Sequence, residues 1–169
     1  MPSSPSFDSE LSAVWPRLRR FAHALARNSA DADDLAQIAA EKAFKSFSQF
    51  QPGTRFDSWV FRICRTSWID TLRSRNRRAA HEAPPESGEA IGFDPTSATE
   101  AAIDLATAQA AMQRLPEEQR EVVALILIEG FGYREAAEIL GQPIGTVSSR
   151  LARGRQALLA MLGEGGQDD

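Results

Sequence analysis

The sequence has few of the residues that reaction centres and disulfide frameworks require. Its single cysteine, Cys64, has no partner for an internal disulfide, and its two histidines, His23 and His81, lie far apart. It contains no Gly-rich phosphate loop and no metal-ligand spacing. We therefore expect no enzyme, no cofactor and no metal, in a reducing cytoplasm. Cys64 lies on an apolar stripe and is expected to be a small core residue.

Long apolar runs and strand-forming residues are also scarce. No stretch of about eighteen apolar residues is long enough to cross a membrane, and residues 1–5 lack the basic and apolar blocks of a signal peptide. One tyrosine and few β-branched runs favour helices. Because 43% of the 169 residues are hydrophobic, the chain can build packed cores. We expect an all-α protein of two small helical domains.

Charge is present in both signs but is sorted by segment. The net charge of -4 argues against a uniformly basic nucleic-acid binder. Residues 54–80 nevertheless hold seven arginines against two acids, whereas residues 82–104 hold six acids and no lysine or arginine. A basic segment is therefore followed directly by an acidic one.

Three helices are expected in the first half. Apolar residues recur at intervals of three and four in the first of them, although Pro16 allows a start near Trp15. Acids near the start of the second helix interact favourably with the positive end of its dipole. The composition of residues 50–55 predicts a turn. The expected helices are 9–28, 31–47 and 56–78, after a disordered leader at 1–8.

The second half is expected to follow a flexible linker. Residues 81–96 are rich in Pro, Gly and Glu and have too little apolar content to pack. Helices resume at about 97–114 and 116–129, and a disordered tail occupies 163–169. The predicted domains are 9–80 and 97–162.

Residues 132–151 have the spacing of a helix-turn-helix. A first helix from about Tyr133 to Leu140 is ended by Gly141, because glycine adopts a left-handed backbone without strain. A second helix begins near Gly145 or Thr146. Its polar edge bears serines and arginines and suits a phosphate backbone and the major groove, although similar helix pairs occur in proteins that do not bind DNA. Its expected apolar positions are Val147, Leu151, Leu158 and Leu162.

Four motifs occur in order along nearly the whole chain. They are Asp31-Ala32-Asp33-Asp34-Leu35-Ala36-Gln37, then Phe56-Asp57-Ser58-Trp59-Val60-Phe61-Arg62-Ile63 leading into Ile69-Asp70-Thr71-Leu72-Arg73, then Leu115-Pro116-Glu117-Glu118-Gln119-Arg120, then Gly145-Thr146-Val147-Ser148-Ser149-Arg150-Leu151. In this order and spacing, the chain resembles a bacterial RNA polymerase sigma factor of the extracytoplasmic-function (ECF) group of the sigma-70 family. The resemblance implies sigma region 2 at 9–80 and sigma region 4 at 97–162.

The resemblance implies promoter recognition by both domains. Region 2 would capture the minus-10 element, because opening a promoter extrudes bases that pockets must stack and hydrogen-bond. The implied minus-10 residues are Arg55, Arg62, Arg65, Thr66, Trp68, Asp70 and Arg73, while Trp59 and Phe61 are expected in the core. The implied minus-35 residues on the second helix of the helix-turn-helix are Thr146, Ser148, Ser149, Arg150, Arg153 and Arg155, with Ser148, Ser149 and Arg150 as base readers.

The resemblance also implies protein partners. Asp33, Asp34 and Gln37 would face the clamp helices of the largest subunit of core RNA polymerase, where a charged rim steers association. An anti-sigma factor would hold the chain inactive.

The chain departs from the family at four positions. Ile38 stands where the family usually has an acid, Thr66 where it often has asparagine, and Ser148 where it commonly has lysine or arginine. Gly154 replaces a usual alanine at an expected cost of about 1 kcal/mol. The promoter sequence preferred by relatives therefore does not transfer.

Three other functions compete with this interpretation. A sigma mimic that titrates an anti-sigma protein would have little use for the seven arginines of 54–80. A helix-turn-helix repressor would leave the basic, aromatic helix of the first half unexplained. An enzyme would need a constellation of catalytic residues that the sequence does not contain.

Overall fold

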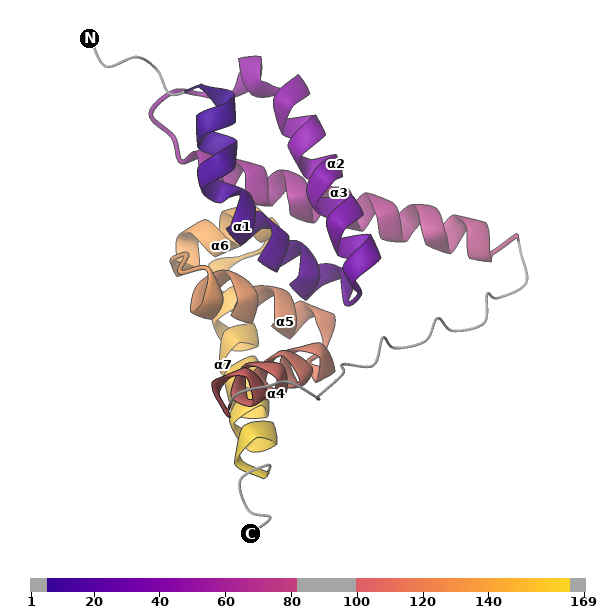
Figure 1. Ribbon diagram of the computed structural model, residues 1–169, viewed down its shortest axis with the longest axis vertical. Helices are drawn as coiled ribbons and strands as arrows, with labels where there is room; N and C mark the ends of the chain where they lie inside the picture. Colours follow the sequence, from indigo (N-terminus) through magenta and orange to yellow (C-terminus); the bar gives the residue numbers. More distant parts are fainter. Residues whose placement is uncertain (1–5, 82–99, 165–169) are drawn as a thin grey trace. The chain divides into compact units, whose positions relative to one another are not determined.

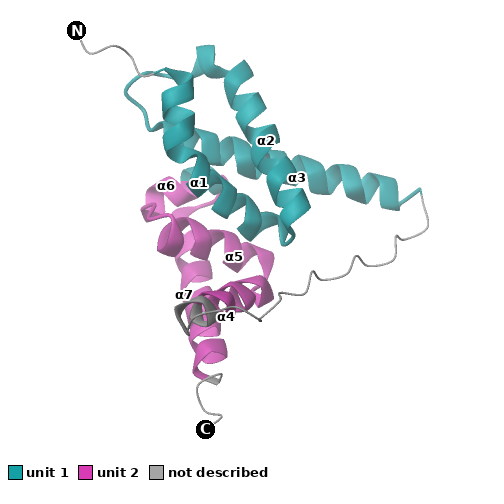
Figure 2. Ribbon diagram, in the orientation of Figure 1, with its two compact units in different colours: residues 1–89, 138–140 teal, residues 90–137, 141–169 magenta. Residues whose placement is uncertain are grey.

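A computed structural model describes residues 6–81 and 100–164, with helices and turns and no strand among them (Figure 1). The chain divides into two compact units, residues 1–89 with 138–140 and residues 90–137 with 141–169 (Figure 2). The prediction of an all-α protein is confirmed. The predicted linker at 81–96 and the expected helix start at 97 lie, apart from His81, outside the described residues.

The first unit is built on three helices. They are α1 (Phe7–Ala26), α2 (Ser29–Lys45) and α3 (Phe56–Ala79), with the 3-10 turn η1 (Phe47–Gln49) between α2 and α3. Their shared core contains Leu18, Phe21, Leu35, Val60 and Phe61, each at most 2% exposed. Phe61 stacks on Phe21 with ring centroids 5.1 Å apart, so the expectation that Phe61 belongs to the core is confirmed.

Helix α1 begins earlier than the sequence indicated. The hydroxyl of Ser6 accepts from the backbone N–H of Ser9 and caps the helix, so Phe7 and Asp8 are helical and not part of a disordered leader. Pro16 stays inside α1, although an internal proline costs about 3 kcal/mol. Apolar residues on both sides of Pro16, including Val14 and Leu18, are buried and hold the helix together across it.

Aromatic rings join the start of α1 to the turn that precedes α3. Phe7 lies 5.2 Å from Phe47 and 5.9 Å from Phe56, centroid to centroid, and Phe50 lies 5.1 Å from Trp59. Edge-to-face and tilted ring pairs of this kind stabilise beyond their buried area. The cluster therefore anchors residues 47–56, the segment from which α3 starts.

The second unit contains the remaining helices, except for residues 138–140 at the end of the helix Tyr133–Leu140, which group with the first unit. The remaining helices are α4 (Glu100–Arg114), α5 (Glu117–Val123), the π-helical segment η2 (Ala124–Ile128), α6 (Tyr133–Leu140) and α7 (Ile144–Glu164). The predicted helix 116–129 thus changes geometry midway, since the N–H of Glu129 donates to the carbonyl of Ala124, five residues back. Helix α7 continues through Gly163 and Glu164, which corrects the expectation that the tail begins at 163.

Candidate nucleic-acid interface

The helix-turn-helix forms where its spacing predicted. Helix α6 covers Tyr133–Leu140, and Gly141 follows it with φ 62°, in the left-handed region that favours glycine. The backbone N–H of Gln142 then donates to Ala137 O at 3.0 Å, and the carbonyl of Pro143 accepts from Thr146 and Val147. The second helix begins at Ile144, one residue before the earliest predicted start.

Helix α7 has one buried side and one exposed side. Val147, Leu151 and Gly154 are buried against the unit, while Leu158 is half-buried and Leu162 is exposed, so Leu162 is not the core residue that its spacing indicated. The exposed side carries most of the predicted minus-35 residues and two residues that sequence reasoning missed. The exposed set is Ser148, Ser149, Arg153 and Arg155, together with the missed Ala152 and Gln156.

The missed pair follows from helical spacing alone. Ser149, Ala152, Arg153 and Gln156 recur at three and four, so they share the centre of the outward face. Thr146 is half-buried, and its carbonyl accepts from the hydroxyl of Ser149 at 3.1 Å.

Arg150 behaves differently from its neighbours on α7. Its side chain is only 22% exposed, and its Nη2 lies 3.2 Å from Glu118 Oε2 on α5. Its Nη1 donates to the side-chain oxygen of Gln142 at 2.7 Å. The guanidinium is therefore held by residues of its own unit.

Gly154 lies where α7 packs closely against α5. A Cβ at this position would lie 2.7 Å from Cγ2 of Val123 and 3.5 Å from Cβ of Gln119. Glycine therefore permits a contact between the two helices that alanine would obstruct. Gly154 thus has a packing role in addition to the helix-propensity cost expected from the sequence.

In the first unit, an open cavity of about 490 Å³ lies between α2 and α3. Of the predicted minus-10 residues, Arg62 and Thr66 line it. Sequence reasoning missed Lys42 and Lys45, which are one helical turn apart on α2, and it favoured the core over DNA for Trp59. The complete lining is Lys42, Lys45, Ser46, Trp59, Arg62, Ile63, Thr66 and Ser67.

The cavity has the chemistry of a site for a nucleotide. Lys42, Lys45 and Arg62 supply three cations, and Asp70 Oδ2 lies 3.7 Å from Lys42 Nζ. The half-buried Trp59 offers an aromatic ring, which packs against Phe50 with ring centroids 5.1 Å apart. Cations beside an aromatic wall suit a phosphate and a base respectively.

Other predicted minus-10 residues lie outside this cavity lining. Arg73 is exposed and Arg65 half-buried on α3. Trp68 is only 6% exposed, and its ring centroid lies 5.7 Å from the guanidinium carbon of Arg75, so most of its surface packs within the first unit. Its contact with minus-10 DNA stays a prediction.

Arg55, also predicted for minus-10 DNA, forms a two-pronged ion pair with Asp57. Its Nε and Nη2 donate to the carboxylate at 3.1 and 2.7 Å, and Arg17 of α1 donates to the same group at 3.0 Å. Burial opposes ionisation of Asp57, but the hydrogen bonds from Arg55 and Arg17 outweigh it and keep its pKa below the ordinary value. The carboxylate thereby ties the turn before α3 to α1.

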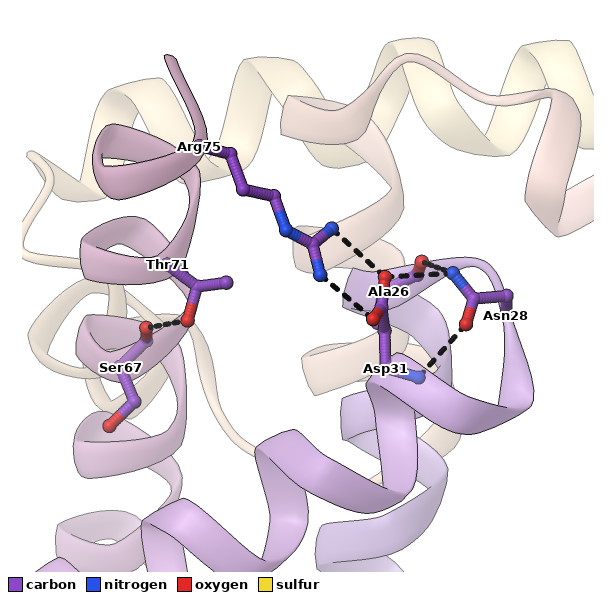
Figure 3. A network of polar contacts seen from close by, with 6 residues as sticks. All are labelled: Ala26, Asn28, Asp31, Ser67, Thr71 and Arg75. Atoms are coloured by element: carbon purple, nitrogen blue, oxygen red, sulfur yellow. Dashed lines mark hydrogen bonds and ion pairs between the residues drawn. The ribbon is translucent and has the colours of Figure 1, made fainter. Parts of the chain in front are cut away.

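The start of α2 is tied to the far end of α3 by Asp31. Both terminal nitrogens of the Arg75 guanidinium donate to this carboxylate, at 2.8 and 2.9 Å, and Asn28 donates to it at 2.9 Å while capping the helix (Figure 3). The hydrogen bonds from Arg75 and Asn28 lower the pKa of Asp31. Arg75 therefore stabilises the fold, a role that the sequence did not reveal.

The predicted polymerase-facing residues divide in the same way. Asp33 pairs with Arg19 of α1 at 3.0 Å, whereas Asp34 and Gln37 are exposed. Glu41, one turn further along α2, is also exposed and continues this row.

Cys64 is fully buried, and burial raises the pKa of its thiol to about 12, so it is unsuited to act as a nucleophile. Among the described residues, no cluster of three or more His, Cys, Asp or Glu is arranged for a metal ion. None of the helices in the described ranges is both long and apolar enough to cross a membrane.

A helix-turn-helix and a cationic, aromatic cavity are features of a helical DNA-binding protein. Residues 12–78 match the family Sigma-70 region 2, and residues 105–158 match Sigma-70, region 4. The chain belongs to the sigma-70 family and is an RNA polymerase sigma factor of the ECF group.

Relatives extend over most of the chain. The ECF RNA polymerase sigma factor EcfG of Rhodopseudomonas palustris is 34% identical over 169 residues, covering 100% of this chain and 92% of its own. The ECF RNA polymerase sigma factor SigE of Mycolicibacterium smegmatis is 38% identical over 157 residues, covering 91% of this chain and 60% of its own.

Solved structures show the same fold. Sigma factor RpoE of Bartonella quintana, solved with the anti-sigma factor NepR, is 31% identical with a TM-score of 0.79 over 96% of this chain and 98% of its own. The anti-anti-sigma factor PhyR of the same organism is 16% identical with a TM-score of 0.56, covering 93% of this chain and 51% of its own, a likeness of fold alone.

Proposed function

We propose that this sigma factor captures an extruded base of the minus-10 element in the cavity between α2 and α3. The observation that supports it is the lining itself, in which Trp59 can stack a base while Lys42, Lys45 and Arg62 approach its phosphates. Thr66 places a hydroxyl beside them, able to donate to or accept from a base edge. Unstacking a base costs a few kcal/mol, and such contacts offset that cost.

The outward face of α7 is the part of region 4 that enters the major groove of the minus-35 element. Ser148 and Ser149 are exposed near its N-terminus, where recognition helices contact base edges, and Arg153 and Arg155 suit phosphates. The proposed domains are residues 9–80 for region 2, to which Phe7 and Asp8 are added, and 97–162 for region 4.

Asp34 and Gln37 form the core polymerase contact, with Glu41 as an addition from the same row. Asp33 takes part only if it exchanges Arg19 for a partner on the polymerase. This work takes place in the cytoplasm, with no catalysis by the sigma factor itself.

An anti-sigma factor controls the chain. Support comes from the structural relatives, since RpoE of Bartonella quintana was solved with the anti-sigma factor NepR, and CnrH, 26% identical with a TM-score of 0.67, was solved with the cytosolic domain of CnrY. Both are similar to this chain over more than 90% of its length.

The test is transcription from a fragmented genomic library by bacterial core polymerase supplied with the purified chain. Mapped start sites should share a two-part upstream motif. Thr66→Ala should change the preference in the downstream part and Arg153→Ala should weaken the upstream part, whereas Arg114→Ala, an exposed arginine on α4, serves as the charge-matched control.

A second candidate is a sigma mimic, because the anti-anti-sigma factor PhyR shares the fold. A mimic would bind an anti-sigma factor and fail to start transcription. Start sites with no common motif, from a chain that does not bind core polymerase, would favour the mimic.

A further inference from the structure

We propose that Arg150 positions the recognition helix instead of reading a base, and that it does so through Gln142, a residue of the turn. The inference rests on the proposed function, in which α7 enters the major groove. It replaces the expectation that Arg150 contacts a base edge. It also assigns a role to a glutamine that the helix-turn-helix pattern treats as a spacer.

The first step is the direction of the Arg150 side chain. Its two terminal nitrogens engage Gln142 Oε1 at 2.7 Å and Glu118 Oε2 at 3.2 Å. The arginine side chain is 22% exposed, compared with 69% for Glu118, so the guanidinium is the more enclosed partner. A charged donor with two acceptors at these distances makes strong hydrogen bonds that a base edge would have to replace.

The second step is the way Gln142 is held. Its side-chain nitrogen donates to Glu121 Oε1 at 3.5 Å, a long bond to a carboxylate on a residue only 5% exposed. Its backbone N–H donates to Ala137 O at 3.0 Å. The amide oxygen therefore faces Arg150 and the amide nitrogen faces Glu121, so one side chain links α5, the turn and α7.

The third step is the place of Arg150 on its helix. The outward face is centred on Ser149, Ala152 and Arg153, which are all exposed, and Arg150 lies on its flank beside the buried stripe. An arginine there controls the angle at which α7 packs against α5. The residues of the outward face then depend on Arg150 for their orientation, and they, not Arg150, contact the DNA.

The experiment measures binding by the full chain with core polymerase to a promoter pool randomised across the upstream element, built from a mapped start site. Gln142→Met removes both side-chain hydrogen bonds at similar size, and Arg150→Met removes the guanidinium. Arg150→Lys keeps the positive charge and loses the two-pronged guanidinium that reaches both Gln142 and Glu118. Gln109→Met, at an exposed position of α4, is the matched control.

Under the proposal, Gln142→Met and both Arg150 variants weaken upstream binding by a similar factor, on the order of tenfold. The double variant is no weaker than either single one. The rank of preferred bases stays the same at every position, and the slope of log K against log salt is unchanged.

Three results would overturn it. Loss of preference at one base pair in Arg150→Met alone would make Arg150 a base reader. A salt slope lower by about 0.9 in Arg150→Met, restored by Arg150→Lys, would make it a phosphate contact. Wild-type affinity for the upstream element in Gln142→Met would remove the link through the turn. A wild-type chain without any upstream preference would instead refute the proposed function, and this inference with it.

Discussion

Replacing Gly154 by alanine should destabilise the second unit, although alanine is the better helix former. Alanine gains about 1 kcal/mol in the interior of a helix such as α7. The new methyl group, however, would lie 2.7 Å from Cγ2 of Val123, a distance that packed carbon atoms do not tolerate. Overpacking of this kind typically costs 1–3 kcal/mol. The expected net effect is a loss of about 1 kcal/mol.

Val123 has little freedom to relieve this contact. It is 1% exposed, and its branched Cβ leaves one preferred rotamer in a helix. Val123→Ala alone should cost about 2 kcal/mol through lost burial and the space left behind. In that background the contact is gone, so Gly154→Ala should now stabilise by about 1 kcal/mol. The two substitutions should therefore be coupled by about 2 kcal/mol.

The assay is hydrogen exchange in increasing urea, followed on peptides from residues 117–162. Tryptophan fluorescence reports the first unit separately, because Trp15, Trp59 and Trp68 all lie there, and it should not change. Gly145→Ala is the control, since a Cβ at Gly145 would meet no heavy atom within 4 Å. Additive effects of Gly154→Ala and Val123→Ala, or stabilisation by Gly154→Ala in the wild-type background, would refute the packing argument.

Three further predictions concern the first unit. Arg75 holds the pKa of Asp31 below its ordinary 3.8, so the stability that Asp31 contributes is complete above that pH and is lost as pH falls through the folded pKa. In urea unfolding, Asp31→Asn should be less stable than wild type at pH 7, and the two stabilities should converge in acid. A difference in stability that stays constant with pH would refute this. Thr66→Val keeps the shape of the cavity lining and removes a hydroxyl, so it should alter base preference at one minus-10 position by roughly fivefold. Transcription from randomised promoters measures this, and an unchanged base preference would remove Thr66 from the site. Asp34→Arg should weaken core polymerase binding at least about tenfold in a fluorescence titration, with Asp8→Arg as the control for charge at a helix N-terminus, and equal binding by both variants would refute the proposed contact.

The helices and the turn between α6 and α7 were predictable because their causes are local. Periodic apolar residues define each helix, and Gly141 has the positive φ that its place after Leu140 predicted. Errors fell at the ends, where a capping hydroxyl from Ser6 added two residues to α1. The tendency of Pro16 to interrupt the helix was overestimated. The energetic cost of the proline can be read from the sequence, whereas the burial that outweighs it comes from packing against neighbouring helices.

The candidate sites were predictable only in part. Arg62 and Thr66 line the cavity, but Lys42 and Lys45 reach it from α2, which no pattern within α3 reveals. Exposure along α7 follows from helical spacing, so Ala152 and Gln156 were available to sequence reasoning and were missed.

The sequence by itself determined the class of protein, the helices and the residues available for DNA. Only the tertiary structure decided which charged side chains remain available. Asp31 and Arg75 are 44 residues apart, as Arg17 and Asp57 are 40 apart, yet each pair forms an ion pair. A long arginine side chain reaches whichever acceptor the packed helices bring near, and that distance is a property of the fold. The same packing buried Trp68, joined Arg150 to Gln142 and made Gly154 a point of contact.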